Sequence, residues 1–145
     1  MDFFDAMNIS SSGLSAQRLR MNLISANLAN VNTTRTKDGG PYRRKDPVFA
    51  ARAPAGSFRE MLRNRQKEHL KEVAVVDIVE DTRAFIKKYD PNHPDSDDKG
   101  YLSMPNINLM EEMVNMISAT RSYEAGITAI QAAKDMALKA LEIGQ

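Results

Sequence analysis

The sequence contains no cysteine and no tryptophan, and aromatic residues make up only 6% of it. The lack of cysteine excludes disulfides and thiolate metal sites. No apolar run approaches the ~18 residues that a membrane span needs. So few aromatic side chains leave little material for a rigid globular core, whereas nine methionines suit the seams between helices. The composition therefore favours helices that pack through Leu, Met and Ala.

The sequence also lacks an export signal at its start and a strong net charge. The first residues, Met1-Asp2-Phe3-Phe4-Asp5, have no basic stretch followed by an apolar one, so we expect the cytoplasm or an exit route without a cleaved signal. The net charge is only +1, but residues 35–71 carry eleven Lys and Arg against four Asp and Glu. Residues 72–112 carry ten Asp and Glu against four Lys and Arg. The middle of the chain is therefore a charge dipole.

The first 34 residues have an apolar pattern with helical spacing. Apolar residues recur every seven positions at Met7, Leu14, Met21 and Leu28. Two more, Ile24 and Val31, lie three positions after Met21 and Leu28. Together these residues form an apolar stripe on one helix face. The pattern stops after Asn30, in a stretch unusually rich in asparagine. The run Ser10-Ser11-Ser12-Gly13 weakens the start, so we expect this helix to fray in isolation.

The last 40 residues show a longer seven-residue repeat, which implies supercoiling against a partner helix. One line of the repeat is Leu109, Met116, Tyr123, Ile130 and Ala137, and a line of small residues runs beside it: Ala119, Gly126, Ala133 and Ala140. Asn108 followed by Glu111 predicts the helix start. Met110, Ile117 and Leu138 widen the apolar surface beyond what one partner helix covers, which favours several helical neighbours.

The middle of the chain contains turn signals and short runs typical of strands. Gly39-Gly40-Pro41 predicts a turn, and "VAVVDIVED", "AFIKKYD" and "YLSMP" predict strands. The stretch "FREMLRNRQKEHLKE" is compatible with a helix or a flexible arm. We therefore predict a mainly α protein with a small β-rich insert. Residues 1–34 and 106–145 form an antiparallel helical pair, and residues 35–105 form the insert at one end of it.

No arrangement of residues predicts catalysis. His69 and His93 lack a positioned partner and are best read as solvated. The loop "DPNHPDSDDKGY" fails the calcium-loop pattern because Pro94, Asp95 and Tyr101 take ligand or glycine positions. Basic runs at residues 43–45 and 63–67 have few interleaved aromatics and an acidic neighbour, which argues against nucleic acid. We predict no enzyme activity, no cofactor and no metal.

Two stretches resemble the bacterial flagellar rod, hook and hook-associated axial proteins: "SSGLSAQRLRMNLISANLANVNTT" and "MEEMVNMISATRSYEAGITAIQAAKDMALKALEIGQ". The stretches "TRTKDGGPYRRKDPVF", "YDPNHPDSDDKGYLSMPNINLMEEM" and "RSYEA" narrow the resemblance to one type of proximal rod protein. It covers about two-thirds of the chain, and residues 53–72 fit it least. Gly126 stands where the family pattern predicts asparagine, at some cost in helix stability.

The resemblance implies a structural subunit of the flagellar basal body. Its terminal helices are expected to pack into the inner tube of a periplasmic drive shaft that transmits torque to the hook. Expected partners are copies of the chain, other rod proteins, the membrane-ring and rod-adaptor proteins, and the flagellar type III export apparatus. Such export accounts for the missing signal peptide. A soluble coiled-coil adaptor, another proximal rod protein and a phosphate-binding module remain alternatives.

On this basis we predict which residues pack between subunits. They are Leu14, Met21, Asn27, Leu28, Asn30, Val31, Met116, Ala119, Tyr123, Gly126, Ile127, Ile130, Ala133, Ala137 and Leu141. Asn27, Asn30 and Asn32 are expected to satisfy the last carbonyls of the first helix and to end it through a left-handed turn, and otherwise to hydrogen-bond to neighbouring subunits. In the insert, Arg43, Arg44 and Lys45 are expected to face Asp95, Asp97 and Asp98 of a neighbour and set the register, with solvated, idle charges as the alternative.

Overall fold

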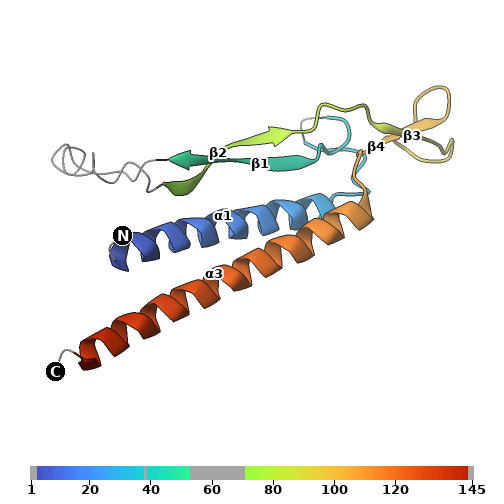
Figure 1. Ribbon diagram of the computed structural model, residues 1–145. Helices are drawn as coiled ribbons and strands as arrows, with labels where there is room; N and C mark the ends of the chain where they lie inside the picture. Colours follow the sequence, from blue (N-terminus) through green and yellow to red (C-terminus); the bar gives the residue numbers. More distant parts are fainter. Residues whose placement is uncertain (1–2, 38, 53–70, 144–145) are drawn as a thin grey trace.

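The computed structural model describes residues 3–37, 39–52 and 71–143. Within these ranges, two long helices lie towards the ends of the sequence and four short strands lie between them (Figure 1). The elements are α1 (Phe3–Ala29), β1 (Lys45–Arg52), β2 (Glu72–Glu80), β3 (Ile86–Tyr89), β4 (Tyr101–Met104) and α3 (Leu109–Ile143). The predicted fold class, mainly α with a small β-rich insert, is confirmed.

The helices α1 and α3 pack side by side and antiparallel (Figure 1). Three contacts fix the direction, because Leu14 lies against Gly126, Met21 lies 3.7 Å from the hydroxyl of Thr120, and Asn27 bonds to Glu112. Along these three contacts the residue numbers rise in α1 as they fall in α3. The seven-residue repeats of the two ends therefore predicted the pairing correctly.

Side-chain hydrogen bonds fix where α1 ends and where α3 begins, and we call these two neighbouring helix termini the inner ends. The Asn108 side-chain oxygen accepts the N–H of Met110 at 3.0 Å, so this residue caps α3 as predicted. At the end of α1, the Asn30 side chain donates to the carbonyl of Ala26 at 2.9 Å. The predicted left-handed turn is wrong, because no residue other than glycine has a positive φ in the described ranges. The other part of that prediction is confirmed for Asn30, whose side chain satisfies one of the last carbonyls of the helix.

The strands β1 and β2 form an antiparallel hairpin with a bulge between Val48 and Phe49. The hairpin lies along α1, on the side away from α3 (Figure 1). The Val73 N–H donates to the Ser12 hydroxyl at 3.1 Å near one end, and Lys45 bonds to Asn27 at the other. The prediction that the whole insert sits at one end of the helical pair is therefore wrong for this hairpin. The strands predicted in "VAVVDIVED", "AFIKKYD" and "YLSMP" are confirmed as β2, β3 and β4, whereas β1 was not predicted.

The second hairpin, β3 and β4, lies beyond the inner ends of the helices (Figure 1). The rings of Tyr89 and Tyr101 meet edge to face across it, with centroids 5.4 Å apart. Its connecting loop is closed by Asp97, which accepts the N–H of Lys99 at 3.0 Å and of Tyr101 at 2.8 Å. The predicted solvated turn between the two strands is thus a defined loop. The predicted helix or arm of residues 58–72 lies almost wholly outside the described residues, as does His69.

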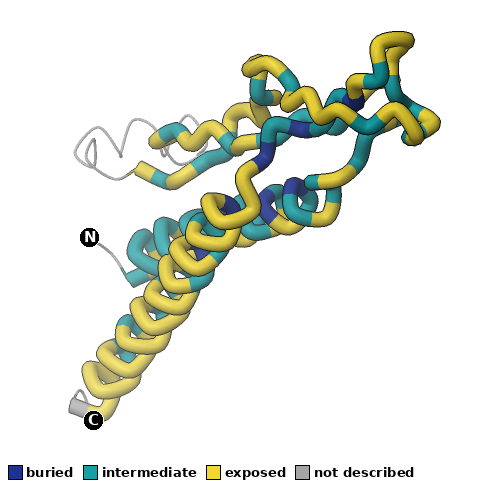
Figure 2. The backbone as a smooth tube through the Cα atoms, turned by 90° about the vertical axis from the view of Figure 1, so that its right-hand side faces the viewer, coloured by how far each residue is buried: buried dark blue, intermediate teal, exposed yellow. Residues whose placement is uncertain are grey.

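The core of the described chain is thin, and α3 is exposed along most of its length (Figure 2). Only small or scattered apolar side chains are buried: Ala16, Ile24, Leu102, Ile107 and Ala119. Within the described residues, no helix combines the length and apolar character that crossing a membrane requires. The α1 helix is covered on two sides, by the hairpin and by α3, so it holds the tertiary structure together.

Candidate functional site

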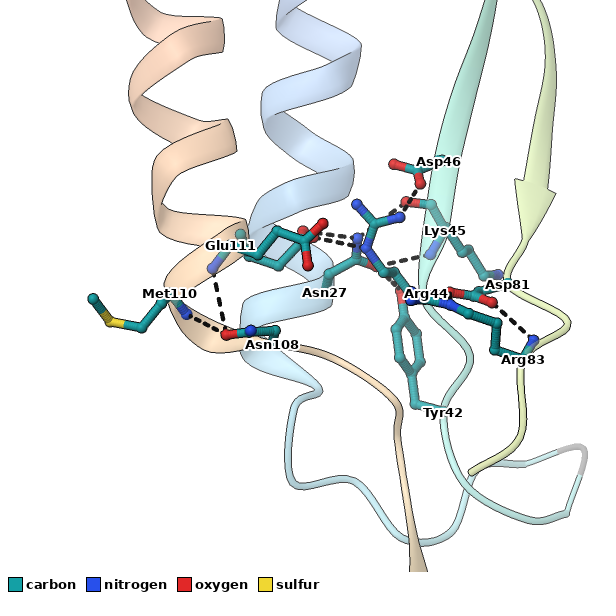
Figure 3. Close-up of polar contacts among 11 residues, drawn as sticks. Asn27, Tyr42, Arg44, Lys45, Asp46, Asp81, Arg83, Asn108, Met110 and Glu111 are labelled. Carbon is teal, nitrogen blue, oxygen red and sulfur yellow. Dashed lines mark hydrogen bonds and ion pairs between the residues drawn. The ribbon is translucent and has the colours of Figure 1, made fainter. Parts of the chain in front are cut away.

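A buried polar junction joins the inner ends of α1 and α3 to the start of β1 (Figure 3). It consists of Asn27, Tyr42, Arg44, Lys45 and Glu112. The Asn27 amide donates to the Lys45 carbonyl at 3.0 Å and to the Glu112 carboxylate at 3.1 Å. Its oxygen accepts the Lys45 N–H at 3.0 Å and the Tyr42 hydroxyl at 3.2 Å. All four hydrogen-bonding positions of this fully buried side chain are therefore filled.

The junction also contains a buried ion pair. Arg44 donates from Nε to Glu112 at 2.7 Å, and its Nη1 contacts Asp46. Glu112 is 1% exposed, and the Arg44 side chain is 13% exposed. A buried carboxylate without a partner is strongly destabilising, whereas a paired and hydrogen-bonded one is tolerated. The ion pair between Arg44, which directly precedes β1, and Glu112 therefore links the start of β1 to the first turn of α3.

Burial also affects the tyrosine of the junction. Desolvation is the main reason why the pKa of Tyr42 is raised above 10.0, and nearby Glu80 and Glu112 raise it further while Lys45 opposes them. The neutral phenol is therefore the favoured form, and it donates to Asn27. The polar groups of the junction bond to one another within the same chain, so the role that the junction supports is structural.

The structure corrects the prediction for Asn27, whereas Asn30 satisfies a carbonyl at the helix end as predicted. Asn27 was expected to hydrogen-bond to a neighbouring subunit, but its side chain is buried and fully bonded within the chain. Asn30 bonds to Ala26 and accepts the Thr33 hydroxyl at 3.0 Å. Asn32 is exposed. Two of the three asparagines in this stretch therefore serve the fold of one subunit.

Most residues predicted to pack between subunits lie instead along the seam between α1 and α3. The side chains of α3 on this face recur at spacings of three and four, and all are at least partly buried: Met116, Ala119, Tyr123, Gly126, Ile130, Ala133 and Ala137. A Cβ at Gly126 would lie 2.8 Å from Cδ2 of Leu14, so a backbone without a side chain lets the helices approach here. Leu14, Met21, Leu28 and Val31 are half-buried, whereas Ile127 and Leu141 are exposed. Packing against another subunit stays a prediction for all of them.

The opposite side of α3 carries an exposed apolar surface, which we call the outer face of α3. Its four residues follow helical spacing over two turns: Met110, Met113, Val114 and Ile117. Their exposed fractions are between 48% and 68%. The sequence indicated Met110 and Ile117 as part of a broad apolar surface, and their exposure agrees with it. Contiguous exposed apolar side chains of this kind mark interaction surfaces.

The two predicted charged clusters do not meet within the chain. Arg44 pairs with Glu112. Arg43 donates to the Asp81 carbonyl at 2.8 Å and lies 4.4 Å above the Phe85 ring, and Lys45 pairs with Glu80 at 3.3 Å. In the acidic loop, Asp95 accepts the Thr34 hydroxyl at 2.8 Å, and Asp98 is exposed. Arg44 thus has its main partner within the subunit, and pairing between subunits stays a prediction for the charged residues of both clusters.

No reactive constellation accompanies these surfaces in the described residues. In residues 3–37, 39–52 and 71–143, no three His, Asp or Glu side chains cluster as metal ligands do. His93 was expected to lack a positioned partner, but its Nδ1 accepts the Asp95 N–H at 3.1 Å within its own loop. This contact organises a turn. What the arrangement can do is hold a rigid shape and present apolar surface.

Sequence reasoning missed the pair of Arg44 and Glu112, although one signal was present. Glu112 continues the line of Ala119, Gly126 and Ala133 at the same seven-residue spacing. An acidic residue at a packed position requires a basic partner nearby. Its partner comes from a segment 68 residues away in the sequence.

Comparison with known proteins identifies the family. A family model described as "Flagella basal body rod protein" matches residues 7–37, and one described as "Flagellar basal body rod FlgEFG protein C-terminal" matches residues 98–143. The flagellar basal-body rod protein FlgC of Borreliella burgdorferi is 47% identical, over 100% of this chain and 99% of the relative. The proteins of that name in Bacillus subtilis and Escherichia coli O157:H7 are 42% and 37% identical over both full lengths. The predicted resemblance is confirmed, and the chain belongs to the FlgC family of flagellar basal-body rod proteins.

Proposed function

We propose that this chain is a non-catalytic structural subunit of the proximal rod, which assembles helically and helps to transmit torque to the hook. Family membership supports the role of rod subunit. The observation that carries the mode of action is the imbalance between buried and exposed apolar side chains. Five hydrophobic residues are buried in the described chain, whereas nineteen large ones are exposed.

This imbalance is what an obligate assembly requires. A chain of 145 residues that folds alone normally buries most of its apolar surface. Here the exposed apolar residues cluster on the outer face of α3 and on the β1–β2 hairpin. Burial of that surface against neighbours stabilises the folded subunit by mass action. Assembly and final stability are therefore coupled.

The polar junction has a defined part in this proposal. It fixes the hairpin and both helices to one another through a buried amide and a buried ion pair. Isolated helical pairs slide and splay, whereas buried polar groups specify one register. A subunit that transmits torque needs such a fixed internal geometry. In this account residues 1–34 and 106–145 form the helical domain, and residues 35–105 form the insert.

The partners proposed from this function are copies of the chain and other rod proteins, together with the membrane-ring and rod-adaptor proteins of the basal body. We further propose export to the periplasm by the flagellar type III apparatus, without a cleaved signal peptide. A thin core supports this route, because a chain that crosses a narrow channel must be unfolded at low cost.

Quantitative mass spectrometry of hook–basal bodies tests the proposal. In a strain that lacks this chain, rods should be incomplete and motility lost, and a copy from a plasmid should restore both. The protein should then be found in the purified basal body in several copies per rod. A soluble coiled-coil adaptor would instead remain in a complex of fixed size outside the basal body, and that result would contradict the proposal.

A further inference from the structure

The β3–β4 hairpin is joined to the rest of the described chain near its base and at its connecting loop. Among the described elements, β3 and β4 pack against each other and against no helix or other strand, and the hairpin projects beyond the inner ends of the helices (Figure 1). Near the base, Arg43 lies 4.4 Å from the centroid of the Phe85 ring and donates to the Asp81 carbonyl at 2.8 Å. The connecting loop, residues 90–100, bonds to the segment after α1 through Asp95. The orientation of the hairpin therefore depends on this second contact.

The second contact is made by both oxygens of the Asp95 carboxylate. The Thr34 hydroxyl donates to Oδ2 at 2.8 Å, and Nη1 of Arg35 lies 3.8 Å from Oδ1. Thr34 and Arg35 belong to the segment that connects α1 to β1. An open groove lies between this segment and the hairpin loop, and its other lining residues are Gly39, Gly40, Pro41, Pro94, Ser96 and Ser103. Asp95 thus bridges the two sides of a groove.

The backbone position of Asp95 is held in turn by His93. Nδ1 of the His93 imidazole accepts the Asp95 N–H at 3.1 Å. The same nitrogen lies 4.0 Å from Oδ2 of Asp95, which is the oxygen that accepts the Thr34 hydroxyl. The His93 side chain is 32% exposed, so water reaches the ring. The carbonyl of His93 accepts the N–H and the hydroxyl of Ser96 at 3.1 Å and 2.8 Å, which fixes the turn around both residues.

This geometry requires a neutral imidazole. A ring nitrogen accepts a hydrogen bond only while it carries no proton, and both nitrogens become donors in the charged form. Histidine is the side chain that ordinarily changes charge between pH 5 and 8. Protonation of Nδ1 would leave the Asp95 N–H without its acceptor and turn two donors towards each other. It would also place a charged donor beside Oδ2, in competition with Thr34. Both changes weaken the bond between the loop and Thr34.

We propose that His93 and Asp95 form a pH-sensitive contact, which joins the β3–β4 hairpin to the segment after α1 while His93 is neutral and releases it when His93 is protonated. From that segment, the charged group that faces the pair is Arg35. The charged residues of the same loop are Asp90, Asp97, Asp98 and Lys99. After release, the contacts of Arg43 with Phe85 and Asp81 remain as the pivot of the hairpin. The pH response belongs to the single chain and does not depend on assembly, so its failure would leave the proposed function intact.

The distance between two spin labels in the purified full-length chain tests this contact. The chain contains no cysteine, so Ser25→Cys on α1 and Lys88→Cys on β3, both at exposed positions, take the labels. A narrow distance distribution is expected at pH 8, and the narrow peak should be lost at pH 5. After correction for the intrinsic effect of pH, the Asp95 amide should exchange about fivefold faster at pH 5, the factor that corresponds to one hydrogen bond of ordinary net strength.

The decisive variant is His93→Asn, because its side-chain oxygen can accept the Asp95 N–H at either pH and does not titrate. The labelled variant should keep the narrow peak at pH 5. The matched control is His69→Asn at the other histidine of the sequence, which should respond to pH as the wild type does. Thr34→Val removes the donor to Asp95 and should give a broad distribution at both pH values.

Three results would each overturn the proposal. The first is a narrow peak at both pH values in the labelled chain with both histidines. The second is loss of the peak at pH 5 in His93→Asn to the same extent as in that chain, which would also reveal general acid unfolding. The third is a pH response of unchanged size in Thr34→Val, because the bond on which the pH is proposed to act is absent there.

Discussion

Replacing Asn27 by alanine tests whether the polar junction determines the stability of the subunit. The substitution removes the amide that bonds to Lys45, Glu112 and Tyr42. Glu112 keeps Arg44 as a partner, and the half-buried Tyr42 can turn towards water. The N–H and carbonyl of Lys45 lose the partners that Asn27 supplied on α1.

The magnitude follows from these two backbone groups. A buried polar group without a partner costs about 1–3 kcal/mol, so the loss of partners for two groups should destabilise Asn27→Ala by roughly 2–6 kcal/mol. Against a total of about 5–15 kcal/mol for an ordinary domain, this is a large fraction. With an m-value of about 1–3 kcal/mol/M, the urea midpoint should fall by an amount on the order of 1 M.

The assay is urea unfolding followed by circular dichroism, with Asn32→Ala as the matched control. Asn32 belongs to the same asparagine-rich stretch but is exposed, so its replacement should change stability by less than about 0.5 kcal/mol. Hydrogen exchange should show faster exchange at the Lys45 amide in Asn27→Ala only. Equal midpoints for the two variants would refute the reasoning.

Further predictions concern the helix seam, two titratable side chains and one pair of oppositely charged residues. Gly126→Leu should destabilise the helical pair by about 1–3 kcal/mol through collision with Leu14 and abolish motility, whereas Ala125→Leu at the exposed neighbouring position should not; normal motility of the Gly126 variant would contradict the close approach. Because the pKa of Tyr42 is raised, the stability that its neutral phenol contributes is complete below pH 10 and is lost as the pH rises beyond that value. Tyr42→Phe should therefore lose less thermal stability than the wild type between neutral and alkaline pH. The pKa of Asp97 is lowered, chiefly by the hydrogen bond from the Tyr101 N–H. The stability that the Asp97 carboxylate contributes to the loop is therefore present above about pH 4 and is lost as the pH falls through the lowered pKa of the folded chain. Asp97→Asn should make the exchange of the loop amides less dependent on acid pH. Reversing Lys45 to Glu and Asp98 to Lys together should restore part of the assembly that either reversal loses, and a double variant no better than the worse single one would exclude that pairing.

Periodic apolar residues made the helical pair predictable from the sequence. Leu14 and Met21 on one end and Met116 to Ala137 on the other follow seven-residue spacing, and the structure places them on one seam. The same spacing could not distinguish packing within a subunit from packing between subunits. Both kinds of contact bury the same residue types at the same intervals, so a face that was expected to meet a neighbour meets α1.

The strand β1 and the polar junction were less accessible to sequence reasoning. Pro47 lies within β1, where proline is disfavoured, and the preceding Lys45 and Asp46 have little strand preference. The hairpin forms because β2 and the side of α1 provide its partners, which is a tertiary effect. The bonds of Asn27 likewise depend on residues 18 and 85 positions away. Asparagine enrichment near the end of a helix marked the region but did not identify these partners.

Methionine oxidation tests most directly the central claim that the exposed apolar surface of the subunit is covered in the rod. Met110 and Met113 on the outer face of α3 are 68% and 48% exposed in the single chain, whereas Met21 and Met116 are partly buried. Brief peroxide treatment and mass spectrometry would compare purified protein with intact hook–basal bodies. Met110 and Met113 should react in the free chain and be protected in the basal body, while Met21 and Met116 change little. Equal oxidation of Met110 and Met113 in both samples would contradict the account.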